Sequence, residues 1–152
     1  MPLFIHESVI DASIEAVFAF HEQADALTKL TPKFPPARVV ERQGGLEKGA
    51  RVILEIGIGP LKQRWVALHT GYEKNRYFVD EQVSGPFRRW VHRHEFESEG
   101  GRTRLRDRVE FNLKGGPVMD ALAGWFAKLM LRPMFRHRHQ VTRSETERRP
   151  PG

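Results

Sequence analysis

The hydrophobic and polar positions of the chain follow successive patterns with different periods. Residues 3–10 read as a strand, and residues 14–30 then carry apolar positions at helical spacing, with Ser13 as a helix N-cap and Pro32 after the second helix. From residue 38 onward the period is two. The alternating segments are residues 38–42, 51–56, 62–70, 76–83, 90–97 and 102–111. The pattern predicts one strand, two short helices and six consecutive strands.

A last segment returns to the helical period. Apolar residues recur from residue 118 to about residue 143, beginning after Pro117, which suits the first turn of a helix. They are Val118, Leu122, Trp125, Phe126, Leu129 and Met130. A helix of that length spans about 40 Å, enough to cross a sheet, and Pro133 is expected to kink it. We therefore predict an α+β fold in which a curved, seven-stranded antiparallel sheet is covered by a long C-terminal helix.

The two strands at residues 90–97 and 102–111 have faces of opposite character. Side chains alternate between the faces of a strand, so one face is almost wholly charged and the other is mostly apolar. The apolar face consists of Trp90, His92, His94, Phe96, Thr103, Leu105, Asp107, Val109 and Phe111. Because this face must be covered, its two histidines and aspartate either satisfy one another or line a cavity.

The expected register of this hairpin places His92 directly opposite Asp107. A two-residue turn at Glu99-Gly100 gives that pairing and leaves pairs of mostly opposite charge on the outer face. A carboxylate beside an imidazole fixes its tautomer and raises its basicity. Three interpretations remain open: a satisfied polar core, contacts that orient a ligand, and a general base formed by His92 and Asp107.

A second polar pair is expected in the preceding hairpin. A turn at Lys74-Asn75 places His69 opposite Asp80 and Ala67 opposite Gln82. The sequence does not decide whether this face or the opposite one is covered, because the opposite face carries four aliphatic residues. These are Val66, Leu68, Val79 and Val83.

Metal and cofactor motifs are weak. His92 and His94 share a face, and two such histidines with a carboxylate can hold zinc or iron. The aromatic surroundings favour a ligand pocket instead, so no metal is predicted. His137 and His139 lie two apart on a helix, hence on different faces, and are expected at the surface. The chain has no phosphate-binding loop, dinucleotide fingerprint or nucleophile elbow, and no cofactor is predicted.

Composition fits one ordinary globular domain, expected at residues 1–147, followed by a frayed tail at residues 148–152. Of the 152 residues, 29% are charged and 39% hydrophobic, and no apolar run approaches the length of a membrane span. The first residues lack the features of a signal peptide, so we expect a cytoplasmic location. The absence of cysteine excludes disulfides and thiolate chemistry.

The net charge of +6 invites comparison with nucleic-acid-binding proteins. The outer charges of the last hairpin are expected to pair with one another, and much of the excess lies in the arginine-rich C-terminus, which argues against a nucleic-acid partner. Peripheral contact with an anionic membrane stays open, as does the oligomeric state.

One run of residues carries a family resemblance. Gly85-Pro86-Phe87 forms a turn that is followed by Trp90, His92, His94 and Phe96 in alternation. With the order of elements, this run resembles the START/Bet v 1 (SRPBCC) superfamily, which has the helix-grip fold, and within it the bacterial polyketide cyclase/dehydrase and lipid-transport-like branch. The resemblance implies binding of a hydrophobic small molecule, such as a lipid, polyketide or quinone, between sheet and helix. A minority of such proteins are enzymes.

The expected function is therefore binding or transport of a hydrophobic or amphipathic molecule in an internal cavity. The predicted apolar wall consists of Trp65, Trp90, Phe96, Phe111, Leu122, Phe126 and Leu129. The predicted polar anchors are Asp80, Gln82, His92, His94 and Asp107. Two alternatives remain: a cyclase or dehydratase in which His92, oriented by Asp107, is the general base, and an interaction protein that uses its basic tail.

Overall fold

The computed structural model describes residues 2–33 and 36–147, and its elements follow the predicted order. The N-terminal half contains β1 (Leu3–Ile10), α1 (Ile14–Glu22), α2 (Ala26–Leu30), β2 (Ala37–Gln43), β3 (Arg51–Ile56), the 3-10 turn η1 (Gly59–Leu61) and β4 (Gln63–Glu73). The rest contains β5 (Tyr77–Ser84), β6 (Phe87–Glu99), β7 (Arg102–Leu113), α3 (Gly116–Ala121), α4 (Ala123–Phe126), the π turn η2 (Ala127–Leu131) and α5 (Arg132–Thr146). The tail at residues 148–152 lies outside the described residues.

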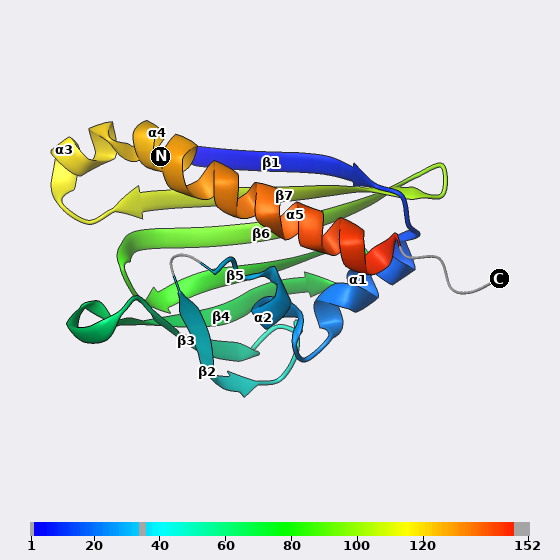
Figure 1. Ribbon diagram of the computed structural model, residues 1–152, viewed down its shortest axis with the longest axis horizontal. Helices are drawn as coiled ribbons and strands as arrows, with labels where there is room; N and C mark the ends of the chain where they lie inside the picture. Colours follow the sequence, from blue (N-terminus) through cyan, green and yellow to red (C-terminus); the bar gives the residue numbers. More distant parts are fainter. Residues whose placement is uncertain (1, 34–35, 148–152) are drawn as a thin grey trace.

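The strands form one antiparallel sheet of seven strands in the order β1-β7-β6-β5-β4-β3-β2. The first strand pairs with the last, which places the start of β1 beside the end of β7, the strand that leads into the C-terminal helices. Figure 1 shows α5 crossing the sheet obliquely, with α1 and α2 beside its C-terminal end. This arrangement confirms the predicted helix-grip fold. Among the described residues, no helix is both long and apolar enough to span a membrane.

The register of the β6–β7 hairpin differs by two residues from the predicted pairing. Glu99 pairs with Arg102, and His94, not His92, lies directly opposite Asp107. The turn is formed by Gly100 and Gly101, both with positive φ (57° and 86°). A tight hairpin turn requires that conformation at both central positions, and glycine adopts it at the lowest cost. Our placement of the turn at Glu99-Gly100 was therefore wrong.

The residues predicted to face inward nevertheless do so, because a shift of two residues in the pairing leaves the alternation of side chains between the two faces unchanged. The inner positions of β7 are buried at every second residue from Thr103 to Phe111. The outer face is a network of opposite charges, as predicted, but with other partners. Arg104 bonds both Glu99 and Glu7, and Glu7 also bonds Arg106.

The C-terminal segment is less regular than the single kinked helix we predicted. It is interrupted at Leu122, between α3 and α4, and again by the π turn, and Pro133 stands in the first turn of α5. Because proline has no N–H to donate, the usual i to i−4 bond cannot form there, and the irregular turn immediately precedes it.

Two apolar clusters fill the space between the helices and the sheet. One lies beneath α4, η2 and the start of α5, and includes Trp90, Phe111 and Phe135. The other lies beneath α1 and includes Phe18, Phe78 and Phe96. The polar residues of the covered face are located between these two clusters: His92 lies 5.1 Å from the Phe135 ring, and His94 stacks on Phe78 at 3.9 Å.

Candidate functional site

Asp107 is the centre of a buried polar group. His92 Nε2 lies 2.7 Å from Asp107 Oδ1, and His94 Nδ1 lies 3.1 Å from the same oxygen. The three residues are between 3% and 5% exposed, and the two imidazole rings stack with centroids 3.6 Å apart. The sequence correctly predicted that these side chains share the covered face. His92 reaches Asp107 diagonally across the pair of strands.

A second carboxylate, Asp80 of β5, faces the opposite edges of the same imidazoles. His94 Nε2 donates to Asp80 Oδ2 at 2.9 Å, and His92 Nδ1 lies 3.9 Å from that oxygen. The Asp80 side chain is 19% exposed, so this is the more open side of the group. The two histidines therefore stand between two carboxylates, one deeply buried and one partly exposed.

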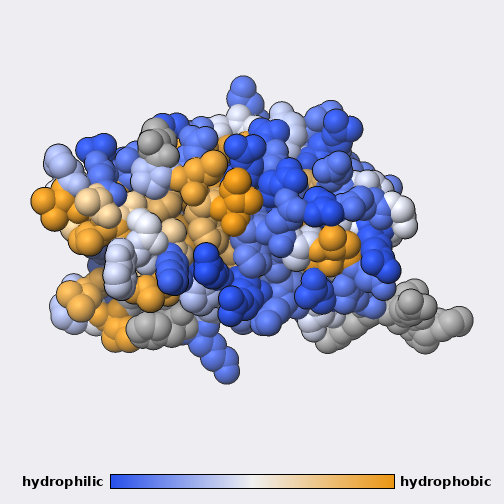
Figure 2. Space-filling model, turned by 90° about the horizontal axis from the view of Figure 1, so that it is seen from above, coloured by the Kyte–Doolittle hydropathy of each residue, from blue (hydrophilic) through white to orange (hydrophobic). Residues whose placement is uncertain are grey.

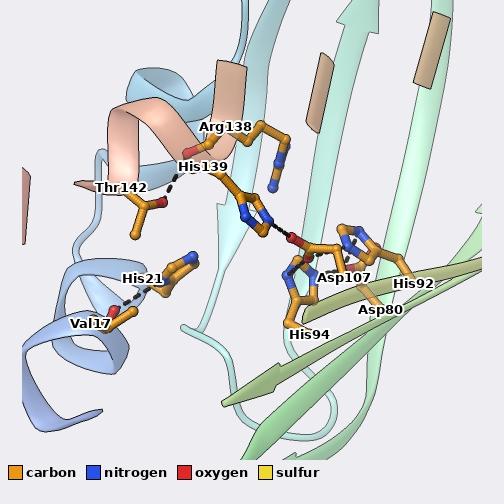
Figure 3. Close-up of polar contacts among 9 residues, drawn as sticks. All are labelled: Val17, His21, Asp80, His92, His94, Asp107, Arg138, His139 and Thr142. Atoms are coloured by element: carbon orange, nitrogen blue, oxygen red, sulfur yellow. Dashed lines mark hydrogen bonds and ion pairs between the residues drawn. The ribbon is translucent and has the colours of Figure 1, made fainter. Parts of the chain in front are cut away.

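His139 of α5 completes the group, and our expectation that it lies at the surface was wrong. It is 3% exposed, its Nε2 lies 2.6 Å from Asp107 Oδ2, and its Nδ1 is within hydrogen-bonding distance of the Ser8 hydroxyl. The His6 ring of β1 contacts it edge-on. Helix and sheet are thus joined through one carboxylate (Figure 3).

A signal for His139 was present in the sequence. The buried positions Leu131, Phe135, His139 and Thr142 are spaced by four, four and three residues, which is one face of a helix. Comparing His139 only with His137 hid that relation, because two residues so close must lie on different faces. The relevant comparison was with Phe135, one turn earlier.

Burial and hydrogen bonds act in opposite directions on the two carboxyl groups. Burial disfavours the ionised form of Asp107, but bonds from His139, His92 and His94 outweigh it and hold its pKa well below the usual range. In Asp80, burial is likewise outweighed by the His94 bond and by the neighbouring imidazoles, which lower the pKa to about 2. Both groups are carboxylates at neutral pH.

The two central imidazoles are shifted in opposite directions. Burial, together with the nearby His94 ring, lowers the pKa of His92 to about 4, although Asp107 and Asp80 favour its charged form. For His94, burial is outweighed by the hydrogen bonds to Asp107 and Asp80, and its pKa is raised. Both His94 nitrogens and His92 Nε2 lie within hydrogen-bonding distance of a carboxylate. Among the four nitrogens of these two rings, His92 Nδ1 is the one whose nearest carboxylate oxygen, at 3.9 Å, is too far for a hydrogen bond.

Arg138 contributes a positive charge beside this group. Its guanidinium lies 5.5 Å from the Phe135 ring and is directed toward the histidine and aspartate side chains (Figure 3). Burial lowers its pKa, against the favourable charges of Asp107 and Asp80. Among the described residues, no hydrogen bond or ion pair holds this guanidinium.

The structure decides which face of the β4–β5 pair is covered. His69 lies opposite Asp80 and Ala67 opposite Gln82, as predicted, and His69, Ala67 and Phe78 are buried. This is therefore the covered face, whereas Val83 on the other face is 59% exposed. His69 Nδ1 bonds the Leu46 carbonyl at 3.1 Å.

Gln82 has a different role from the one predicted. Its amide nitrogen donates to the Phe87 carbonyl at 2.7 Å, and its amide oxygen accepts from the Phe87 N–H at 3.1 Å. A Cβ atom at Gly85 would lie 2.5 Å from that oxygen, so a larger residue there would displace the Gln82 amide from its bonds to Phe87. Gln82 braces the β5–β6 turn, and its amide is occupied by the backbone.

The predicted apolar wall is only partly buried. Trp90, Phe96 and Phe111 lie in the core, and Trp65 and Phe126 pack half-buried against the first cluster. In contrast, Leu122 and Leu129 are 46% and 61% exposed and do not line the interior. The break at Leu122 and the wider π turn change which residues face inward, and Ala123 and Leu131 are buried in their place.

A hollow of about 600 Å³ lies elsewhere, mainly over the outer face of β5, β6 and β7. Its lining is mainly charged and includes Arg76, Arg93, Arg104 and Arg106. These arginines belong to the outer charged face, and the histidine and aspartate group is not part of this hollow. We therefore place the candidate site on the covered face.

Comparison with protein-family models identifies the family of the chain. A family model described as polyketide cyclase/dehydrase and lipid transport matches residues 10–137. The chain belongs to this family. No protein with a curated function matches the chain significantly in sequence.

Solved structures show that the fold of this family member is widespread. The aromatase/cyclase Zhui from Streptomyces sp. R1128 aligns with a TM-score of 0.74 and 14% identity, covering 97% of this chain and 94% of its own. TTHA0849 from Thermus thermophilus aligns with a TM-score of 0.73 and 18% identity, covering 95% and 96%. CV1439 from Chromobacterium violaceum gives 0.70 and 13%, covering 98% and 100%. At these identities the likeness shows the fold alone.

Proposed function

We propose that this protein binds a hydrophobic or amphipathic small molecule between the sheet and the C-terminal helices. One observation carries the proposal: a polar edge formed by His92 Nδ1 and Asp80, with the positive charge of Arg138 in the same buried region, lies between two aromatic clusters. Pockets for small molecules combine apolar walls with a few placed polar groups in this manner. The polar end of the ligand would contact this edge.

The exposure of the covered face supports access from the Asp80 side. α5 packs against β1, α1 and α2, and the inner residues of β6 and β7 are buried. The inner residues of β3, Leu54 and Ile56, remain only half-buried, as does Trp65 of β4. This less covered part of the concave face gives apolar surface for the body of a ligand next to the polar edge.

Native mass spectrometry of the protein before and after incubation with a lipid and metabolite extract tests this proposal. We expect a discrete added mass whose occupancy falls at least tenfold in Arg138→Gln, because an anionic or carbonyl oxygen would lose its charged donor. Arg136→Gln, a change at an exposed arginine of the same helix, is the matched control. An unliganded mass throughout, or equal loss in both variants, would contradict the proposal.

A second candidate function is that of a cyclase or dehydratase. It is favoured by the 2.7 Å contact between His92 Nε2 and Asp107, which holds the ring and leaves Nδ1 toward the space where a ligand would lie. In this reaction Nδ1 would remove a proton from a carbon activated by neighbouring carbonyl groups. His92→Gln should then abolish turnover of a poly-β-ketone substrate while retaining its binding, and unchanged turnover would exclude the role.

A further inference from the structure

Asp80, His92 and His94 meet the requirements of a metal-binding site. One donor atom from each residue lies within 4.8 Å of the other two. We propose that these three residues bind a divalent transition-metal ion of the zinc or ferrous-iron type. The inference goes beyond the binding function proposed above, because metal binding can be measured without any organic ligand.

The donor atoms converge on one place. His94 Nε2 and His92 Nδ1 lie 2.9 and 3.9 Å from the same oxygen, Asp80 Oδ2. Two ligand atoms that are each about 2.1 Å from a metal at a tetrahedral angle lie about 3.4 Å apart. The two observed distances bracket this value. Because the rings are stacked with 30° between their planes, binding an ion would turn them apart until both nitrogens point at it. The alternation of β6 places both imidazoles on one face, and the pairing of β5 with β6 places Asp80 beside them.

The far edges of both imidazoles are held as metal-binding histidines usually are. His92 Nε2 and His94 Nδ1 both contact Asp107 Oδ1, at 2.7 and 3.1 Å. Such a carboxylate behind the ligands fixes ring orientation and directs the remaining nitrogen at the metal. The second oxygen of Asp107 is bonded by His139, which contacts Ser8 in turn, so these supporting residues are themselves anchored on α5 and β1.

The donor set indicates the class of metal. Two imidazole nitrogens and one carboxylate oxygen, without thiolate, are typical of zinc and non-haem ferrous sites, whereas Ca²⁺ and Mg²⁺ prefer oxygen ligands throughout. Three protein ligands leave at least one coordination position for water or a ligand oxygen. Because Asp80 is the most exposed of the three side chains, at 19%, that open position faces the accessible side of the site.

The test is titration of the full chain, freed of metal by a chelator, with Zn²⁺ in a calorimeter and with Co²⁺ followed by visible absorption. We expect one ion per chain. Asp80→Asn and His92→Gln should each weaken binding at least 100-fold, because each removes a ligand. His137→Gln, at a partly exposed histidine of α5 outside the site, should leave it unchanged and controls for adventitious binding to histidine.

Histidine ring nitrogen chemical shifts of the wild-type protein give a readout that does not depend on the stability of any variant. Zn²⁺ should shift Nδ1 of His92 and Nε2 of His94 selectively. The absence of saturable binding, binding that survives in folded Asp80→Asn and His92→Gln, or shifts confined to other histidines would overturn the inference. A protein that binds the organic ligand with a chelator present but shows no metal binding would refute this inference while leaving the proposed function intact.

Discussion

At the scale of single residues, Asp107 shows how much one side chain organises. It accepts from three imidazoles on two elements, β6 and α5, and each of these side chains is almost fully buried. A buried carboxylate without such partners would cost several kcal/mol, so the group is stable only as a set. The sequence allowed His92, His94 and Asp107 to be grouped on one face. Asp80 was also among the predicted polar anchors, although the covered face of its strand was left open. The sequence did not reveal that His139 completes the group.

His21 provides a prediction about pH. It is buried in α1 against Phe78 and Phe96, its Nδ1–H donates to the Val17 carbonyl, and burial lowers its pKa to about 3. The nearest charges, on His94, Asp107 and Arg138, change this value only secondarily. The folded protein thus keeps His21 neutral while the unfolded chain protonates it near pH 6.5.

The contribution of His21 is therefore lost as pH falls below about 6.5. Between pH 7 and pH 5 this residue alone should lower the free energy of unfolding by about 2 kcal/mol. Urea denaturation at the two pH values measures the loss, and in His21→Gln the difference between them should shrink by about that amount. An identical pH dependence in wild type and variant would contradict this assignment.

At the scale of elements, the β6–β7 hairpin and the C-terminal segment differ in how well the sequence predicted them. The alternation of polar and apolar residues identified both strands and their faces. The turn was misplaced by one residue, because it forms at the two glycines that adopt positive φ. In the C-terminal segment the helical period was predicted correctly, but the side of the helix that faces the sheet was not. The interruption at Leu122 and the π turn rotate Leu129 outward and bring Leu131 inward.

The hairpin turn can be tested by substitution at Gly101, where φ is 86°. A β-branched residue in this conformation is expected to cost about 1–2 kcal/mol or more, because its Cβ is crowded by the backbone. Gly101→Val should lower the denaturation midpoint accordingly, while Gly101→Asn should lower it less, since asparagine tolerates positive φ better. Equal effects of the two variants would indicate that the turn does not require this conformation.

At the scale of the whole molecule, the surface combines positive charge with an exposed apolar region. Val118, Leu122, Trp125 and Leu129 are between 46% and 72% exposed, and Ile58 and Leu61, at and beside η1, are also exposed. Figure 2 shows hydrophobic side chains gathered at the end of the molecule where α3, α4 and η1 lie. Lys128 and Arg132 flank the helical part. Interfacial helices combine apolar and basic faces in this way.

The net charge of the chain left contact with an anionic membrane as an open question. We expect such contact to be made by this exposed apolar and basic surface. The C-terminal arginines are a weaker candidate, since Arg143 already bonds the Val9 carbonyl and Glu147. Co-sedimentation with vesicles containing phosphatidylserine should be lost in Trp125→Glu and should weaken with salt. Val83→Glu, at an exposed apolar residue on the outer face of the sheet, is the control. Equal binding by both variants would exclude this surface.

The sequence by itself determined the order of the elements, the face on which each strand residue lies, and the presence of polar groups inside. These follow from periods of two and 3.6, which are local properties of the backbone. Only the tertiary structure decided which partners meet. Asp107 contacts His139 from 32 positions away, and His139 contacts Ser8 from 131 positions away. Such contacts depend on the register of the strands and the rotation of the helix, and a shift of two residues in register leaves every local pattern unchanged.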